Sequence, residues 1–284
     1  MIIGIIGNGF VGKATQLLYN SKINMLVYDI IPELCNPPGL TLEDLKKCDI
    51  IFIALPTPMA NNGSCYTQII DNVVSQLNNI IDKNRTSIVL RSTVPPGTSK
   101  KLDVYFMPEF LTEKNWENDF VNCKHWIFGY NGNNTEYDNL FIQKITKLFD
   151  MAYLEGKIKY NNYHFISSDE AELVKYTRNC FLALKVSFFN EIAQYAELKK
   201  INYLNVRDLV ILDERIGTSH TLIGVDGKKG YGGTCFPKDT NALKYDMEQS
   251  GMKSYIIDAS IKRNELIDRP EKDWNTNKGR AVIE

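Results

Sequence analysis

The 284-residue sequence lacks an excess of either charge. Its 33 basic and 34 acidic residues leave a formal net charge of −1, and the two signs are interleaved along the chain. Function through a broad attraction to nucleic acid or to an anionic membrane is therefore excluded. No apolar run approaches the roughly 18 residues of a membrane span. The apolar N-terminus is interrupted at Gly7, which argues against a secretory leader.

The six cysteines include no CxxC pair and show no regular spacing. Zinc sites and disulfide frameworks need such spacing, so we expect neither a metal nor a disulfide network. A reducing cytoplasm is the simplest compartment for this chain, because it would keep a reactive thiol usable.

The first half of the sequence alternates short β-branched runs with helical stretches. The expected strands are residues 2–6, 25–29, 50–55, 88–93, 104–107 and 126–130, and the expected helices are residues 11–20, 42–47, 69–81 and 137–149. Near-continuous apolar strands that alternate with helices predict an α/β fold, a Rossmann-type doubly wound parallel sheet. We assign residues 1–165 to this domain.

The second half has a different pattern. Residues 168–199 contain neither glycine nor proline and carry apolar residues at helical spacing, which predicts one long connecting helix. Shorter helices are expected at residues 206–213, 239–249 and 254–266. We therefore expect an all-helical domain over residues 166–268, followed by a polar, poorly ordered tail over residues 269–284.

A GxGxxG motif follows the first strand and opens a helix. Gly7 permits the tight turn, Gly9 lets a pyrophosphate approach the backbone, and Gly12 lets the helix pack close to the strand. Asp29 closes the second strand, where a carboxylate binds the adenosine ribose and repels the 2′-phosphate of NADP. The motif predicts NAD as cofactor. Its predicted contacts are Gly7, Gly9, Phe10, Val11, Gly12 and Asp29.

Two more strand ends support a cofactor crevice. Residues 55–58 follow the third strand and residues 92–97 follow the fourth. Both place hydroxyls and prolines at carboxyl ends of parallel strands, where open α/β sheets bind ligands. We expect Pro56, Thr57 and Thr93 to line this crevice.

Residues 230–239, Gly-Tyr-Gly-Gly-Thr-Cys-Phe-Pro-Lys-Asp, form the most informative segment. Three glycines within four residues would let a ligand approach the backbone. Cys235 lies in a loop that leads into a helix, near Lys238, and both features stabilise a thiolate. A lone cysteine is usually core packing, but these neighbours favour a nucleophile.

On the long helix, Lys175 and Asn179 are four residues apart and share a face, and Glu172 precedes Lys175 by three. Taken alone, this spacing is typical of a solvated helix face with one ion pair.

In their order along the chain, these segments resemble the UDP-glucose/GDP-mannose dehydrogenase family, and within it the UDP-glucose 6-dehydrogenases. The resemblance rests on residues 7–12, 55–58, 92–97, 108–111, 170–179, 190–191, 213–217 and 230–239. It implies NAD-dependent, four-electron oxidation of UDP-glucose to UDP-glucuronate. Cys235 would hold the aldehyde as a thiohemiacetal and then carry a thioester that water hydrolyses.

The resemblance also implies the remaining catalytic roles. Lys175 and Asn179 would stabilise oxyanions at the reacting carbon. Asp239, with Thr93, would hold the catalytic water, and Glu109 would be the acid or base of the hydrolysis.

For ligand binding, the resemblance implies that Glu113 and Lys238 contact the cofactor. The implied substrate contacts are Glu109, Phe110, Leu111, Lys175, Asn179, Arg215, Tyr231 and Gly232. Arg215 would reach the substrate of a neighbouring subunit, which implies a homodimer through the long helix. The alternative for Arg215 is a surface ion pair with Asp213 or Glu214.

Three alternatives stay open. The sugar depends on pocket shape, so GDP-mannose or a UDP-N-acetylhexosamine is a possible substrate in place of UDP-glucose. Family members usually carry a third, nucleotide-binding domain, and no strand–helix alternation follows Leu266. A weakly active or non-catalytic NAD-binding subunit is therefore a second hypothesis. A one-step β-hydroxyacid dehydrogenase is the third, although it has no use for the Cys235 loop.

Overall fold

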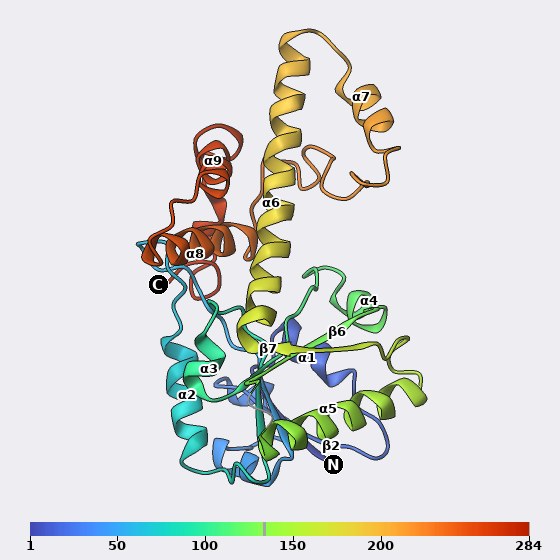
Figure 1. The fold of residues 1–284 in the computed structure, drawn as a ribbon, viewed down its shortest axis with the longest axis vertical. Coiled ribbons are helices and arrows are strands. Elements are labelled where there is room, and N and C mark those ends of the chain that lie inside the picture. The colour runs from blue at the N-terminus through green and yellow to red at the C-terminus, as the bar shows by residue number, and fades with distance from the viewer. Residues whose placement is uncertain (133–134, 284) are drawn as a thin grey trace. The chain divides into compact units, whose positions relative to one another are not determined.

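The structure, a computed structural model, describes residues 1–132 and 135–283. Its elements are drawn along the chain in Figure 1. The chain forms two compact units. The first comprises residues 1–57 and 67–175, and the second comprises residues 58–66 and 176–284. The loop after the third strand therefore leaves the first unit and packs with the second.

The first unit is built on a seven-stranded sheet in the order β2-β1-β3-β4-β5-β6-β7. The strands are β1 (Ile2–Ile6), β2 (Asn24–Tyr28), β3 (Ile50–Ile53), β4 (Ser87–Leu90), β5 (Tyr105–Phe106), β6 (Trp126–Tyr130) and β7 (Tyr163–Ser167). Neighbouring strands run parallel except β5 and β6, which pair antiparallel. The strand order reverses between β1 and β3, where such sheets bind nucleotides.

Helices cover both faces of this sheet. They are α1 (Phe10–Gln16), α2 (Gln68–Asn78), α3 (Thr98–Leu102), α4 (Trp116–Val121) and α5 (Glu136–Leu154), with 3-10 turns at Pro32–Leu34 and Leu42–Lys47. Ile50 and Phe52 of β3 belong to the buried cluster that includes α5, whereas Ile51 and Ile53 belong to the cluster that includes α2. Because successive residues of one strand are buried on opposite faces, the predicted doubly wound sheet is confirmed.

Strand β7 was not expected from the sequence. It pairs parallel with β6, with Ile127 opposite His164. None of its residues is fully buried, because it forms one edge of the sheet. An edge strand with a histidine and a serine lacks the continuous apolar run by which the central strands are recognised.

The long helix α6 spans Ser168–Leu198, close to the predicted residues 168–199. Ser167 caps its start: the Ser167 hydroxyl accepts from Glu170 N, and the Glu170 carboxylate accepts from Ser167 N at 2.8 Å. Residues 168–175 belong to the first unit, and the rest of the helix belongs to the second. The second unit adds α7 (Tyr203–Val210), α8 (Phe236–Gln249), α9 (Ile256–Arg263), a π-turn at Asn264–Asp268 and a 3-10 turn at Asp273–Thr276.

The C-terminal segment is packed, which corrects the expectation of a poorly ordered tail after residue 268. The side chains of Trp274 and Ala281 are 2% and 1% exposed. Met59 N donates to Ala281 O at 2.9 Å, and Ile283 N donates to Met59 O at 3.0 Å. The polar sequence concealed this, because one buried tryptophan and two backbone hydrogen bonds leave no periodic pattern. Glu284 lies outside the described residues.

Within the described ranges, none of the helices combines the length and the apolar character that crossing a membrane requires. Among the same residues, no group of three or more His, Cys, Asp and Glu side chains is arranged to hold a metal ion. None of the six cysteines is in a disulfide.

We predict that Trp274→Ala destabilises the second unit by about 3–5 kcal/mol, because it leaves a large cavity in a packed interior. The measurement is urea denaturation followed by helical circular dichroism. Leu266→Ala is the control, since Leu266 is 69% exposed and its loss should change little. A Trp274→Ala protein as stable as the control would mean that the segment contributes nothing to folding.

Candidate functional site

The glycine motif forms the turn that a dinucleotide needs. Gly7 has φ +93°, and a Cβ on it would lie 2.5 Å from the Ala54 carbonyl oxygen. A Cβ on Gly12 would lie 1.9 Å from the Gly7 carbonyl oxygen, so neither position admits a side chain. Around Gly9, no atom lies within 4 Å of the Cβ position. The loop is therefore closed where the protein packs and open at Gly9, where a pyrophosphate would approach Phe10 and Val11 at the start of α1.

Asp29 lies beside this loop at the end of β2. Its Oδ2 accepts from Asn8 N at 2.7 Å, and its Oδ1 accepts from Ile31 N at 3.0 Å. The carboxylate is thereby oriented next to the glycine turn, which is the position predicted for the ribose contact. The residues present fit NAD, and the negative charge disfavours the 2′-phosphate of NADP.

The ends of β3 and β4 are joined by side-chain hydrogen bonds. Leu55 N donates to Ser92 Oγ at 3.0 Å, and Thr57 Oγ1 donates to Thr93 O at 2.8 Å. Thr57 and Thr93 are both buried, whereas Pro56 is exposed. These two predicted crevice segments are thus brought together at one edge of the sheet.

Glu109 and Lys175 form a buried ion pair in the first unit. Lys175 Nζ donates to Glu109 Oε1 and to Glu109 O, both at 2.7 Å, and the side chains of Lys175 and Glu109 are 3% and 6% exposed. Glu109 Oε2 also accepts from Leu111 N at 2.7 Å. Burial raises the pKa of Glu109, but the charge and hydrogen bond of Lys175, the hydrogen bond from Leu111 N and the charge of Arg91 together outweigh burial and hold this pKa below its ordinary value. Glu109 is therefore a carboxylate at neutral pH, the form that acts as a base.

The remaining predicted residues of this unit are less enclosed. Phe110 is half-buried, with its ring centroid 5.6 Å from Lys175 Nζ. Leu111 is half-buried and Glu113 is exposed. These positions leave room for the contacts that the resemblance implies.

The structure decides against a solvated helix face around Glu172. Glu172 is fully buried, and it accepts from Gly97 N at 2.7 Å and from Ser99 N at 2.8 Å. Burial raises the pKa of Glu172 to about 7. Glu172 thus joins α6 to the start of α3, and it makes no ion pair with Lys175.

Arg91 was not identified from the sequence. Its side chain is 2% exposed, and Nη1 donates to Thr15 Oγ1 of α1 at 2.6 Å. Burial lowers the pKa of Arg91 to about 10, and Glu109 opposes this effect. Arg91 places a buried positive charge between the glycine-motif helix and Glu109. The sequence feature that could have identified Arg91 is an arginine at the end of an otherwise apolar strand.

In the second unit, the glycines before Cys235 serve contacts within the protein. A Cβ on Gly230 would lie 2.3 Å from Asn264 Oδ1, and a Cβ on Gly232 would lie 2.6 Å from Arg269 Cζ. Gly233 has φ +73° and open space at its Cβ position. The close approach that the sequence suggested for a ligand is made at Gly230 and Gly232 by side chains of this chain.

Cys235 is the N-cap residue of α8 and is half-buried. Thr234 Oγ1 lies 3.8 Å from Cys235 Sγ. Burial lowers the pKa of Lys238, but the attraction of Asp239, Cys235 and Cys65 outweighs burial and raises it above its ordinary value. A helix N-terminus and a fully protonated lysine both stabilise a thiolate.

Asp239 links two other predicted residues in this unit. Its Oδ2 accepts from Asn179 Nδ2 at 2.6 Å, and its Oδ1 pairs with Lys238 Nζ at 2.5 Å. Asp239 is 1% exposed and Asn179 is 8% exposed. The structure therefore gathers Asn179, Lys238 and Asp239 around the start of α8, where Cys235 lies.

Tyr231 and Arg215 differ in their surroundings. Tyr231 is 4% exposed, and its backbone N and O both bond to the side-chain amide of Asn264 at 2.8 Å. Its ring packs against Phe236, so ring stacking on a sugar nucleotide finds no support here. The Arg215 side chain is 88% exposed and pairs with Asp213 at 2.6 Å, the surface ion pair that was its alternative.

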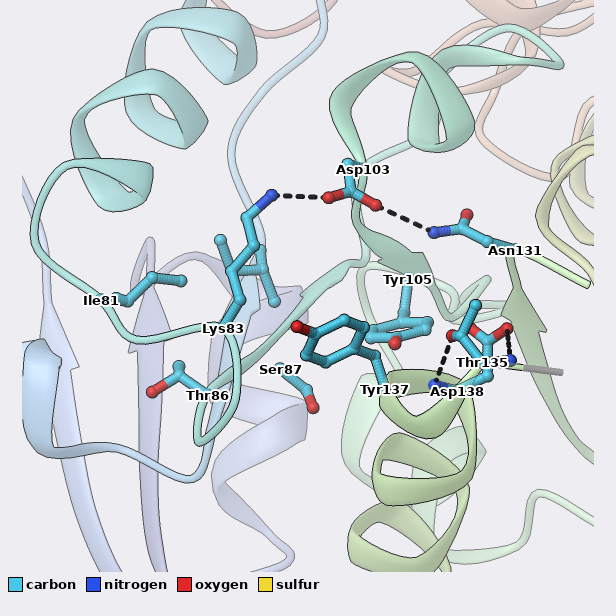
Figure 2. Close-up of a pocket in the computed structure, with 11 residues that line it drawn as sticks. Ile81, Lys83, Thr86, Ser87, Asp103, Tyr105, Asn131, Thr135, Tyr137 and Asp138 are labelled. Carbon is cyan, nitrogen blue, oxygen red and sulfur yellow. Dashed lines mark hydrogen bonds and ion pairs between the residues drawn. The ribbon is translucent and has the colours of Figure 1, made fainter. Parts of the chain in front are cut away.

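A cavity of about 270 Å³ lies elsewhere in the first unit (Figure 2). Ser87 and Tyr105 in its wall are the first residues of β4 and β5, so it lies at the amino ends of these strands. Lys83 and Asp103 pair at 2.6 Å along its rim. None of the predicted site residues lines this cavity, and the glycine motif lies at the opposite ends of the strands.

We predict that Lys175→Met destabilises the first unit by about 3–5 kcal/mol near neutral pH, because Glu109 is left as an unpaired buried carboxylate. Without Lys175 the pKa of Glu109 should rise, since burial is no longer offset. The loss should therefore shrink as the pH is lowered and Glu109 becomes protonated. Denaturation curves at several pH values measure this. In a Lys175→Met, Glu109→Gln double variant the loss of stability relative to the wild type should no longer depend on pH in this way. If this pH dependence persisted, Glu109 would not be the buried carboxylate that Lys175 compensates.

Sequence comparison identifies relatives across both units. The NAD binding domain of the UDP-glucose/GDP-mannose dehydrogenase family matches residues 40–151, and the central domain of that family matches residues 169–266. A putative UDP-glucose 6-dehydrogenase, YtcA of Bacillus subtilis, is 30% identical over 234 residues, covering 76% of this chain and 50% of the relative. The chain thus spans about half the length of this relative.

Two solved structures have the same fold. A UDP-glucose dehydrogenase from Pyrobaculum islandicum superposes with a TM-score of 0.77 at 25% identity, over 93% of this chain and 68% of that one. A UDP-D-ManNAc dehydrogenase from Pyrococcus horikoshii superposes with a TM-score of 0.73 at 20% identity, over the same shares of the two chains. The NAD binding domain of the family, matched over residues 40–151, identifies NAD as the cofactor. The glycine turn and Asp29 precede the matched residues and fit the same cofactor. The chain belongs to the UDP-glucose/GDP-mannose dehydrogenase family.

Proposed function

We propose that this chain oxidises the C6 alcohol of UDP-glucose to a carboxylate in two NAD-dependent steps, with Cys235 as covalent nucleophile. The observation that carries the proposal is the position of Cys235 at the start of α8, next to Lys238. A thiol placed there is activated for attack on a carbonyl carbon. The reaction takes place in a reducing compartment, the cytoplasm, where the thiol stays reduced.

The chemistry explains why a thiol is needed. NAD, when bound, would accept one hydride in each of the two oxidations, and the hydroxyl proton of the reacting carbon would leave to a base or to water. After the first, the sulfur of Cys235 adds to the C6 aldehyde, an S–C bond forms, and the carbonyl oxygen takes up a proton. The resulting thiohemiacetal carbon still carries the hydrogen that leaves as the second hydride. Water then attacks the thioester, the S–C bond breaks, and the thiol and a carboxylate are released.

The surrounding residues have defined roles in this proposal. The Lys175 ammonium and the Asn179 amide stabilise negative charge on the C6 oxygen. Glu109, a carboxylate paired with Lys175, takes protons during the hydrolysis. Asp239 and Thr93 hold the water. Buried, hydrogen-bonded charges are suited to this because they need not reorganise during the reaction.

Binding roles follow the family resemblance. On the cofactor side, Glu113 lies near the nicotinamide and Lys238 contacts NAD. Phe110, Leu111 and Gly232 offer backbone groups to the nucleotide sugar. The identity of the sugar is the open part, because UDP-N-acetylhexosamine and GDP-mannose require only a different pocket around the same thiol. A non-catalytic NAD-binding subunit and a one-step β-hydroxyacid dehydrogenase are the competing functions.

We also propose that two copies pair through α6. Phe181, Phe188 and Tyr195 are 62%, 58% and 57% exposed and are spaced seven residues apart, so they form one stripe along the helix. An aromatic stripe of this kind is typical of a surface that a helix partner covers. In the dimer, Arg215 extends to the substrate of the neighbouring subunit.

With a limiting amount of UDP-glucose, we expect two NADH per sugar, counted by absorbance at 340 nm. Cys235→Ala should lower the rate of NADH formation by about 10³-fold or more, because the covalent route is lost. Cys48→Ala, which removes a thiol buried in the first unit, serves as control and should keep the two-to-one ratio. One NADH per sugar would favour the β-hydroxyacid type of reaction. No NADH with any nucleotide sugar would favour the non-catalytic subunit.

In sedimentation analysis, we expect the protein to have twice the 32.5 kDa mass of one chain. Phe188→Glu should give the monomer mass, because a charge cannot be buried in an apolar helix interface. Leu154→Glu is the matched control, since Leu154 is 80% exposed on α5 of the first unit. A wild-type monomer at micromolar concentration would rule out the α6 dimer.

A further inference from the structure

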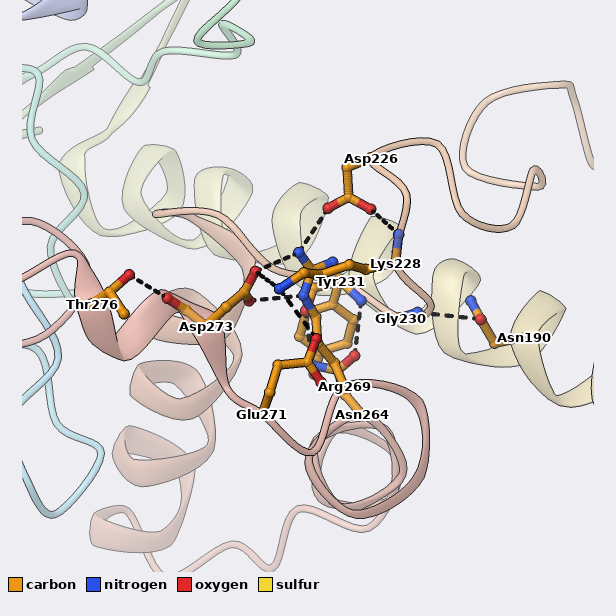
Figure 3. Close-up of polar contacts among 10 residues, drawn as sticks. All are labelled: Asn190, Asp226, Lys228, Gly230, Tyr231, Asn264, Arg269, Glu271, Asp273 and Thr276. Atoms are coloured by element: carbon orange, nitrogen blue, oxygen red, sulfur yellow. Dashed lines mark hydrogen bonds and ion pairs between the residues drawn. The ribbon is translucent and has the colours of Figure 1, made fainter.

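One arginine of the C-terminal segment, Arg269, covers the loop that precedes Cys235. Figure 3 shows Arg269 with its partners Asp226 and Asp273. The three atoms nearest to a Cβ built on Gly232 are Arg269 Cζ, Nε and Nη2, at 2.6, 2.7 and 2.8 Å. Three atoms of one guanidinium at nearly equal distance mean that its flat face lies against the Gly232 backbone. Glycine is required at position 232 because Arg269 occupies the space of a side chain.

Arg269 is itself held firmly. Its Nη2 donates to Asp226 Oδ2 at 2.7 Å and to Asp273 Oδ2 at 2.8 Å, and its Nε donates to Asp273 Oδ1 at 2.8 Å. The side chain is 4% exposed. The hydrogen bond to Asp273 is the main cause that raises the pKa of Arg269 above its ordinary value. Two carboxylates on either side fix the plane of the guanidinium.

The same loop is held from other elements by two amides. Tyr231 N donates to Asn264 Oδ1, and Asn264 Nδ2 donates to Tyr231 O, both at 2.8 Å. Gly230 N donates to Asn190 Oδ1 of α6 at 3.2 Å. A run with three glycines has a large conformational freedom to lose, so these contacts select one conformation from many.

We propose that Arg269 is a positioning residue: by stacking on Gly232 it fixes the loop that presents Cys235 at the start of α8. The inference rests on the proposed function for the role of Cys235, and on the described contacts for the brace itself. Arg269 acts through its shape, because Asp226 and Asp273 already neutralise its charge. A lysine could keep one ion pair but has no flat face to cover the glycine.

The test combines Arg269→Ala and Arg269→Lys with readouts on the loop and on turnover. Hydrogen–deuterium exchange of peptides within residues 228–236 should be faster in both variants than in the wild type. The rate at which iodoacetamide alkylates Cys235, followed by mass spectrometry, should change in both. For turnover, kcat should fall by about 10²-fold, because a displacement of about 1 Å in a reacting group has this effect. The KM for NAD should change less than kcat, because most of the proposed NAD contacts lie in the first unit and Lys238 is the proposed contact on α8.

Two further variants make the test specific. Lys272→Ala removes a neighbouring ion pair, the one with Glu265, and should leave loop exchange and turnover unchanged. Gly232→Ala alone should speed loop exchange, because its methyl group displaces the guanidinium. When Gly232→Ala is added to Arg269→Ala, loop exchange should change little further, since the space beside Gly232 is then empty.

The outcomes separate the two proposals. Wild-type loop exchange in Arg269→Ala, or wild-type behaviour of Arg269→Lys in all readouts, would overturn the stacking brace. Faster exchange with unchanged kcat would also overturn it as a positioning device for catalysis. If the wild type turns over no nucleotide sugar, the proposed function fails. Exchange, alkylation and the Gly232→Ala cycle would then still decide whether Arg269 orders the loop around Cys235.

Discussion

The first turns of α6 are fastened to the carboxyl ends of the sheet by two buried carboxylates, and the candidate site of the first unit depends on this attachment. Glu172 of α6 accepts two backbone N–H groups at the start of α3, and Lys175 of α6 pairs with Glu109 beyond β5. Taking such charges out of water is expensive unless each is fully hydrogen-bonded. Here each carboxylate accepts hydrogen bonds of 2.7 to 2.8 Å, so helix and strand ends are held in one arrangement.

This attachment also explains why the polar residues are suited to chemistry. Lys175 and Glu109 are already dehydrated, paired and oriented in the described structure. In the second unit, Asp239 holds both Asn179 and Lys238 near the N-terminus of α8 in the same way. Each group of charges is complete within its own unit. A substrate would therefore meet oriented charges whose ordering was provided by folding.

The glycines illustrate how one residue type serves two purposes. At Gly9 the space of the missing side chain is empty, which suits a cofactor phosphate. At Gly230 and Gly232 the corresponding space is taken by Asn264 and Arg269. The sequence pattern is similar in both loops, and only the neighbours distinguish a binding cradle from an internal packing contact. The second loop is therefore held by contacts within the protein.

The local sequence determined the features that depend on near neighbours. The glycine turn, Asp29 after β2, the central strands and the 31-residue helix α6 all follow from short-range patterns of residue type and spacing, and the structure confirms them. Cys235 at a helix start was predictable for the same reason, because loop glycines, a proline and a helix lie within a few residues.

Only the tertiary structure decided the features that join distant segments. The edge strand β7 exists by pairing with β6, Glu172 is buried by the start of α3, and Arg269 lies on a glycine far before it in sequence. Trp274 is buried although its neighbours are polar. Pairing, burial and stacking between remote residues leave no periodic trace along a chain, since their free energy arises only when the segments meet.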